Sequence, residues 1–258
     1  MTGWKYINSS EIGTAHIETG VRKQDSSFCW IGATPHKDTT GAFIAIVSDG
    51  AGSAEKGGQG AALVTRTFGV RAREFLRSHT TRPTEADIAH WIQQARARIV
   101  LAARSRDLKP RDFAATLVAA IVFEDEVLIA HIGDGAAVGL RHDAQDWETL
   151  SWPETGEYAS TTFFVTDTPF PSLRFAHHEG RFERLAIFSD GIERIALDFQ
   201  TQSPHQAFFT SLTRPLEAVE DTGCSRLLSS SLSAFLSSER VNARTDDDKT
   251  LILALRAR

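Results

Sequence analysis

The sequence has few cysteines, no long apolar run and no long run of Lys or Arg. Its two cysteines, Cys29 and Cys224, lie far apart without a CxxC pair, which argues against a zinc site and a disulfide framework. No apolar stretch reaches the roughly 18 residues of a membrane span, and residues 1–6 are too polar for a signal peptide. A net charge of -5 speaks against nucleic acid as the main partner. We therefore expect a cytoplasmic protein with no membrane or nucleic-acid partner.

The remaining composition is that of a globular chain. Its 258 residues are 41% hydrophobic, which is enough for a sizeable core. No internal repeat, low-complexity tract or linker divides the sequence, so one domain over residues 1–258 is the simplest organisation. Short strand patterns occur in hairpin-linked runs, interrupted by one helical pair and followed by another helical region. This order predicts an α+β fold, a four-layer α-β-β-α sandwich of two antiparallel sheets flanked by helices.

The apolar spacing predicts individual elements. Strands are expected over a set of short alternating or fully apolar segments, among them residues 4–7, 15–19, 25–31, 43–47 and 113–123. Residues 25–48 are expected to form an antiparallel hairpin whose second strand is buried on both faces. Helical spacing predicts a helix over 60–78, and Thr84 with Asp87 resembles the capping box of the next one. In that second helix we expect Arg96 and Arg98 to lie on a solvated face.

Three of the predicted strands end in the same dipeptide. Asp-Gly follows an apolar run at Asp49, Asp134 and Asp190. Burying a carboxylate at the end of such a strand is costly unless a cation, a proton or hydrogen-bond donors compensate it, and the glycine lets the backbone turn sharply. A single Asp-Gly pair would indicate an ordinary turn. The repetition favours a shared site instead.

Two further aspartates, Asp25 and Asp247, also lie at strand edges. If the strands belong to one sandwich, all five strand ends can meet on one rim. Clustered carboxylates repel one another, and a pair of divalent cations can hold them ionised. All-oxygen ligation suits Mg²⁺ or Mn²⁺ rather than zinc. Two such ions about 4 Å apart can acidify a water that attacks a phosphorus or carbonyl centre.

The order of these motifs resembles that of a known family. Gln24-Asp25, Ser48-Asp49-Gly50, Gly133-Asp134-Gly135, Ser189-Asp190-Gly191 and Asp247-Asp248-Lys249-Thr250 are similar to the motifs of the metal-dependent protein phosphatases of the PP2C (PPM) type. The resemblance runs from about residue 10 to the end, and Gly156-Glu-Tyr with Thr162-Phe-Phe is similar to the compact bacterial branch. It implies hydrolysis of phosphoserine and phosphothreonine on a protein, without a covalent enzyme intermediate. A cytoplasmic Ser/Thr kinase or its target is then the expected partner in bacterial signalling.

The resemblance also implies a role for each aspartate. Asp49 would bridge two Mg²⁺ or Mn²⁺ ions, with the Gly50 carbonyl completing one coordination sphere. Asp190 and Asp247 would ligate the same pair, and Asp25 would hold metal-bound water. A hydroxide between the ions would then attack phosphorus in line with the leaving serine or threonine oxygen.

The sequence departs from the family pattern at two positions near the reacting phosphoryl group. Gly20 stands where the family commonly has a phosphate-binding arginine, so Arg22 and His16 are the candidates for that role. Residues 51–54 lack the histidine that is suited to protonating the leaving group. Lys56 or water remains for that step.

A third cation is an open question. Asp134 matches the first aspartate of the family's third-metal site, but the second position falls on Arg194, with Glu193 beside it.

Two other functions stay open. The missing histidine and the displaced arginine are compatible with a catalytically weak phosphoprotein-binding regulatory module of the same fold. A two-metal nuclease or other phosphodiesterase is the third alternative, and the acidic charge with no basic groove pattern argues against it.

Overall fold

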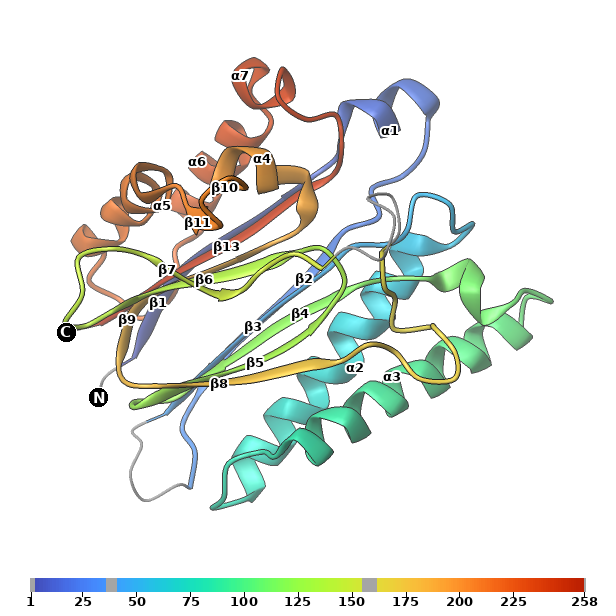
Figure 1. Ribbon diagram of the computed structural model, residues 1–258, viewed down its shortest axis with the longest axis horizontal. Coiled ribbons are helices and arrows are strands. Elements are labelled where there is room, and N and C mark those ends of the chain that lie inside the picture. Colours follow the sequence, from blue (N-terminus) through green and yellow to red (C-terminus); the bar gives the residue numbers. More distant parts are fainter. Residues whose placement is uncertain (1–2, 36–40, 155–161, 258) are drawn as a thin grey trace.

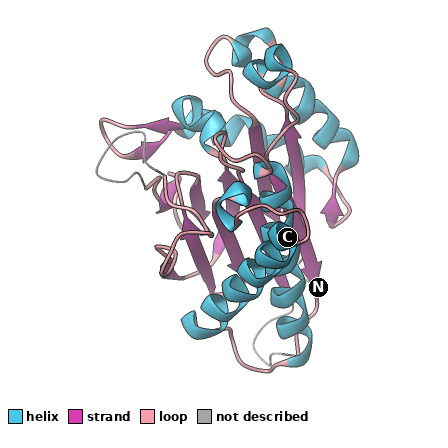
Figure 2. Cartoon of the chain, turned by 90° about the vertical axis from the view of Figure 1, so that its right-hand side faces the viewer, coloured by secondary structure: helices cyan, strands magenta, loops and turns pink. Residues whose placement is uncertain are grey.

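Two β-sheets lie face to face, and helices cover both outer faces (Figures 1 and 2). The computed structural model describes residues 3–35, 41–154 and 162–257. One sheet has six strands in the order β12-β1-β13-β9-β6-β7, and the other has five in the order β2-β3-β4-β5-β8. All pairings in the two sheets are antiparallel except the short parallel pair of β1 with β12. The α+β sandwich predicted from the sequence is confirmed.

The strands are short and mostly apolar. The six-stranded sheet contains β12 (Gly223–Cys224), β1 (Trp4–Glu11), β13 (Lys249–Arg256), β9 (Phe182–Phe188), β6 (Ala136–Arg141) and β7 (Glu148–Ser151). The five-stranded sheet contains β2 (Ser26–Gly32), β3 (Ala42–Ser48), β4 (Leu117–Val122), β5 (Glu126–Ile132) and β8 (Arg174–Glu179). A separate two-stranded piece joins β10 (Leu197–Asp198) and β11 (Ser203–Pro204).

The helices form the two outer layers. Beside the five-stranded sheet lie α2 (Gly57–Ser78) and α3 (Glu85–Arg104), and η1 (Pro110–Phe113) follows them. The other side carries α4 (Glu193–Ala196), α5 (Gln206–Thr213), α6 (Arg226–Leu236) and α7 (Glu239–Asn242), with the 3₁₀ turns η2 (Asp190–Ile192) and η3 (Arg214–Ala218). The capping box predicted at Thr84 is present, since its side chain and that of Asp87 bond each other's backbone N–H groups.

Three apolar layers hold these four structural layers together. Strand β3 belongs to two of them, because successive side chains of a strand point to opposite faces. Phe43 and Val47 pack between the sheets, whereas Ile44 and Ile46 pack against the α2–α3 side. A third cluster lies between the six-stranded sheet and α5–α6. The expectation that this strand is buried on both faces is confirmed.

Residues 15–19, predicted as an edge strand, instead belong to the helix α1 (Thr14–Thr19). Gly20 ends this helix with φ of 69° and donates its N–H to the carbonyls of His16 and Ile17. No residue of α1 is buried, so the short apolar alternation has no sheet face to cover. The strand predicted from this alternation is therefore wrong.

Two smaller predictions are also wrong. Residues 113–116 precede β4 rather than forming its start, because η1 turns the chain there. Arg96 is not on a solvated face, since Nη1 donates to the carbonyls of Val165 at 2.6 Å and Asp167 at 2.7 Å.

Other expectations from composition have different outcomes. Both cysteines are free thiols. None of the helices in the described part of the chain combines the length and the apolar character needed to cross a membrane. Residues 155–161, which include Gly156-Glu-Tyr, lie outside the described residues, so the likeness of that segment to the compact bacterial branch stays a prediction.

Candidate active site

Five aspartates lie at the same end of the two sheets, opposite to the end at which Trp4 pairs with Arg256. The strand register fixes this arrangement. At that end the paired residues are Ser26 with Ser48, Leu117 with Ile132, Ala136 with Phe188, Leu251 with Phe188, and Glu11 with Lys249. Each aspartate adjoins one of these paired ends: Asp25, Asp49, Asp134, Asp190 and Asp247. Side chains that are far apart in the sequence are thereby brought to one rim.

The glycine of each Asp-Gly pair is required by a close backbone contact. A Cβ atom on Gly50 would lie 2.2 Å from the carbonyl carbon of Gly57. On Gly191 it would lie 1.9 Å from the Asp248 carbonyl oxygen, and on Gly135 it would lie 2.7 Å from that of Phe188. None of the three has a positive φ. Close approach, rather than the sharp turn expected from the sequence, explains why glycine follows each aspartate.

Asp25 links the two sheets at the site. Its Oδ2 accepts a hydrogen bond from Ser189 Oγ at 2.7 Å, and that Oγ accepts one from the Thr250 N–H at 3.0 Å. The residue is only 6% exposed, and its Oδ1 has no hydrogen-bond partner among the described residues. Burial raises the pKa of Asp25, and the nearby Asp248 raises it further.

Asp49 is fixed through its backbone. Its N–H donates to Thr116 Oγ1 at 3.0 Å, and its carbonyl accepts from the Thr116 N–H at 2.8 Å. Burial raises the pKa of the Asp49 carboxyl well above its ordinary value, and repulsion from Asp25, Asp190 and Asp247 adds to the shift. A carboxylate in such surroundings needs a proton or a cation.

Asp190 is in a similar position. Burial raises its pKa well above the ordinary value, and Asp134, Asp247, Asp25 and Glu193 contribute through repulsion. Its Oδ1 is buried and has no hydrogen-bond partner in the described part of the chain. The two most strongly shifted carboxyls therefore face the same group of acids.

Asp134 lies on the neighbouring side of this group. Its Oδ2 accepts a hydrogen bond from Thr162 Oγ1 at 2.5 Å, while Oδ1 is buried without a partner among residues that the structure describes. Burial and the nearby Asp134 together raise the pKa of Glu193 to about 7, although Arg194 opposes the shift. Asp134 and Glu193 therefore interact electrostatically, and these are the two acids that the sequence places at or beside the third-cation positions.

The donor set suits an oxygen-loving divalent cation. Three buried carboxylate oxygens, on Asp25, Asp134 and Asp190, have no hydrogen-bond partner among the described residues, although buried polar groups normally have one. Within those residues, no three His, Cys, Asp or Glu side chains are arranged as a complete metal-binding group. Mg²⁺ is usually held by one or two carboxylates and completes its shell with water. Such a cation fits these residues, whereas zinc sites are usually built on Cys or His ligands, which this group of aspartates does not supply.

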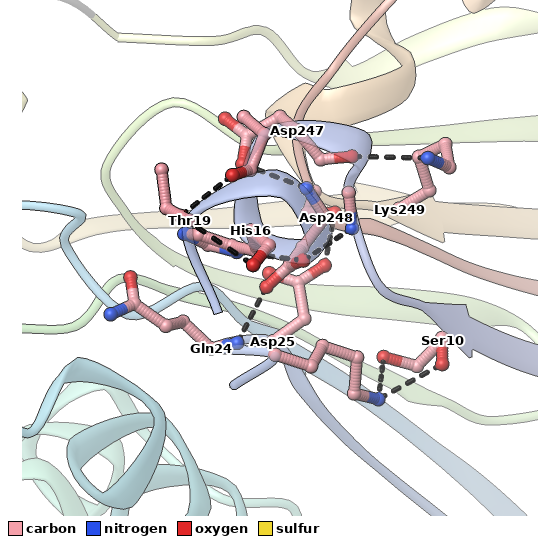
Figure 3. Close-up of polar contacts among 12 residues, drawn as sticks. Ser10, His16, Thr19, Gln24, Asp25, Asp247, Asp248 and Lys249 are labelled. Atoms are coloured by element: carbon pink, nitrogen blue, oxygen red, sulfur yellow. Dashed lines mark hydrogen bonds and ion pairs between the residues drawn. The ribbon is translucent and has the colours of Figure 1, made fainter. Parts of the chain in front are cut away.

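Asp248 is a residue of the site that the sequence motifs did not single out. It is 1% exposed. Its Oδ1 accepts from the Gly13 N–H at 2.7 Å, and its Oδ2 accepts from the Gln24 N–H at 2.5 Å (Figure 3). Nδ1 of His16 lies 3.0 Å from Oδ1. Asp248 therefore holds the segment that leads into Asp25, and the only signal in the sequence was a second acid beside Asp247.

Lys249 holds the other side of the same loop. Its Nζ donates to Asn242 Oδ1 at 3.1 Å and to the Asp247 carbonyl at 3.2 Å. Asn242 is the last residue of α7. This contact connects α7 with the backbone of Asp247.

The two candidates for phosphate contact are in different surroundings. His16 is engaged with Asp248. Arg22 is exposed and lines a cavity of about 480 Å³ together with Lys56 and Gly57. Lys56 Nζ lies 3.0 Å from a carboxylate oxygen of Glu55. Arg22 and Lys56 thus share one hollow, and His16 does not line it.

The sequence is similar to that of known proteins. Residues 12–237 match the family described as Protein phosphatase 2C. The chain is 36% identical over 254 residues to Serine/threonine-protein phosphatase 3 of Escherichia coli (strain K12), covering 98% of each chain.

Solved structures support the fold. The serine/threonine phosphatase Stp1 from Staphylococcus aureus aligns with a TM-score of 0.63 and 16% identity, covering 97% of this chain and 94% of that one. The catalytic domain of the serine threonine protein phosphatase PstP, in complex with 2 manganese ions, aligns with a TM-score of 0.62 and 17% identity, covering 100% of both chains.

Proposed function

The chain belongs to the protein phosphatase 2C family, and from this premise we propose that it hydrolyses phosphoserine and phosphothreonine on a protein substrate. The observation that carries the proposal is the meeting of five strand-end aspartates whose carboxyls have raised pKa values or buried oxygens without partners. An acidic rim of this kind would repel an anionic phosphoester unless bound cations neutralise its charge.

We propose that Asp49, the Gly50 carbonyl, Asp190 and Asp247 hold two Mg²⁺ or Mn²⁺ ions. When bound, such ions acidify water and neutralise the phosphoryl oxygens. Asp25 would orient water from outside the ligand set, because its hydrogen bond from Ser189 fixes one oxygen and leaves the other free. Asp134, with Glu193 nearby, is the candidate for a third cation.

For contact with the phosphoryl group we favour Arg22, because its exposed guanidinium lines an open cavity. Lys56 in the same cavity is the side chain available to protonate the leaving oxygen, with water as the alternative. His16, held against Asp248, would act by positioning the segment before Asp25. These roles are compatible with Gly20 being at the end of α1, where the family commonly has arginine.

The proposed substrate is a phosphorylated protein, and a cytoplasmic Ser/Thr kinase or its target is the proposed partner. We also propose that residues 1–258 form one phosphatase domain. Support comes from the chain ends: β1 pairs with β13 along its whole length, so the first and last strands belong to the same sheet. A catalytically weak regulatory module of this fold is the second candidate, because Gly20 carries no side chain to bind phosphate.

The test is hydrolysis of p-nitrophenyl phosphate and of a phosphothreonine peptide with and without Mn²⁺. We expect Asp49→Asn and Asp190→Asn each to lower turnover by at least about 100-fold, because each removes a charged cation ligand. Asp221→Asn, an exposed aspartate outside the site, is the matched control and should keep wild-type turnover.

Metal-independent turnover, or full activity of Asp49→Asn, would contradict the proposal. Undetectable turnover together with tight phosphopeptide binding would favour the regulatory module.

A further inference from the structure

A groove adjoins the acidic site on the side of α4–α7. The acidic site itself opens into a small cavity of about 190 Å³, which is lined by Asp190, Asp247, Arg194 and Arg244 among others. The larger groove, of about 450 Å³, is lined by the same two arginines and by residues of α5, α6 and α7. Because the two hollows share Arg194 and Arg244, a ligand in one would adjoin a ligand in the other.

The groove is basic, although the whole chain carries a net charge of -5. Arg240 of α7 adds a third guanidinium to its lining, and no Asp or Glu is among the lining residues. Arginines elsewhere in the molecule form ion pairs, as Arg174 does with Glu154 and Arg256 with Glu124. Within the described part of the chain, Arg240 and Arg244 form no ion pair or side-chain hydrogen bond. Exposed guanidiniums left free beside a reaction site are suited to an anionic ligand.

The inner surface of the groove is apolar. Phe208 of α5 and Phe235 of α6 line it, with ring centroids 6.3 Å apart, and Leu212 lies beside them. All three side chains are only half-buried. The groove can therefore contact the apolar part of a peptide while its arginines contact acidic groups.

The groove is also held in place relative to the acidic site. Helix α7, which carries Arg240, ends at Asn242, and Lys249 connects that residue with the Asp247 carbonyl. A fixed distance between an anion-binding surface and a reaction centre is what selects among substrates of similar chemistry.

We propose that this groove binds the residues next to the phosphorylated serine or threonine and selects substrates with acidic side chains there, Asp, Glu or a second phosphorylated residue. The inference rests on the proposed function and deepens it by naming the substrate class. Its occupant is a phosphopeptide segment. When the phosphorylated residue lies in the acidic site, the peptide on either side of it must continue over the adjoining surface. The Arg240 side chain takes part in selection and lies outside the smaller cavity.

The test compares phosphothreonine peptides that differ only in flanking residues: three glutamates, three alanines or three lysines. We expect wild-type kcat/KM in Mn²⁺ to be roughly tenfold higher for the glutamate peptide than for the alanine peptide, since several exposed ion pairs add small increments. Added salt should reduce this preference by screening. Arg240→Glu should abolish the preference or reverse it toward lysine, and Arg240→Gln should give an intermediate ratio.

The matched control is Arg98→Glu on α3, an exposed arginine away from the groove, which should keep the wild-type ratio. Circular dichroism checks that each variant is folded. Equal kcat/KM for the glutamate and alanine peptides, or an unchanged ratio in Arg240→Glu, would overturn the inference while p-nitrophenyl phosphate hydrolysis still supports the phosphatase.

If no substrate is turned over, the proposed function fails, and fluorescence polarisation with the same labelled peptides still tests the groove. Tighter binding of the glutamate peptide by wild type than by Arg240→Glu would support the groove. Equal binding would contradict it.

Discussion

At the scale of single residues, the site consists of buried carboxyl groups whose hydrogen bonds compensate their burial only in part. Burial is the largest cause of the raised pKa values of Asp25, Asp49 and Asp190. Burial shifts the ionisation of each group toward the protonated form in the metal-free molecule, and a bound divalent cation would favour the ionised form. Cation binding and proton release at this rim are therefore coupled.

This coupling predicts that neutralising one carboxyl stabilises the metal-free protein. The folded-state pKa of Asp190 is above its unfolded value of about 3.9. Below that value the side chain is protonated in both states, and as pH rises toward the folded pKa its ionisation progressively costs stability. We expect Asp190→Asn to raise the free energy of unfolding at pH 8, because the amide cannot ionise in the buried site.

Urea unfolding in a chelator measures this difference. The gain should shrink as pH falls and disappear below the unfolded-state pKa of about 3.9, and Asp221→Asn should show no gain at high or low pH. A variant that is less stable than wild type at pH 8 would show that the Asp190 carboxylate has a favourable partner.

At the scale of elements, the local apolar pattern of the sequence predicted where strands form, but it did not predict the contacts between distant segments. The run from Phe43 to Val47 is apolar on both faces, and the pairing of β2 with β3 follows from a short connection. The helix α1 and the role of Asp248 could not be predicted in this way. Asp248 contacts Gly13, which lies 235 positions away, and no window of sequence contains such a contact.

The same limit applies to the site. The five aspartates were recognisable because each follows or precedes an apolar strand, whereas their meeting depends on how both sheets are registered. Arg96 shows the converse case. Its helical position predicted a solvated face, but two backbone carbonyls from residues 165 and 167 lie within its reach.

An element-scale prediction concerns the segment held by Asp248. Asp248→Ala leaves the buried Gly13 and Gln24 N–H groups without their acceptor, and each such loss costs about 1–3 kcal/mol. We expect lower stability and faster amide hydrogen exchange over residues 13–24. Asp248→Asn keeps one acceptor oxygen and should be intermediate.

Asp246→Ala is the control. Asp246 is exposed and lies two positions before Asp248, and its carboxylate forms no side-chain hydrogen bond in the described structure. Hydrogen exchange with mass spectrometry reads the segment directly. Unchanged exchange in Asp248→Ala would mean that the segment is held by other contacts.

At the scale of the whole molecule, the site is built from both sheets. Asp25 and Asp49 come from the five-stranded sheet, whereas Asp190 and Asp247 adjoin strands of the six-stranded sheet. A cation bound between them would resist separation of the two sheets. The apolar layer between the sheets and the acidic rim should therefore unfold together.

This arrangement predicts one cooperative thermal transition that Mn²⁺ shifts upward. Saturation at about 100 times the dissociation constant adds about 2.7 kcal/mol, which corresponds to a Tm increase of roughly 5–10 °C for a chain of this size. Differential scanning calorimetry measures the shift, and Asp49→Asn should reduce it strongly. Two separate transitions would contradict the single domain.

The most direct measurement is anomalous diffraction at the manganese absorption edge from crystals soaked in Mn²⁺. We expect two anomalous peaks about 4 Å apart at the acidic rim, where Asp49, Asp190 and Asp247 would hold the ions. Peaks bound elsewhere on the molecule, or an acidic rim without any peak at saturating Mn²⁺, would contradict this expectation.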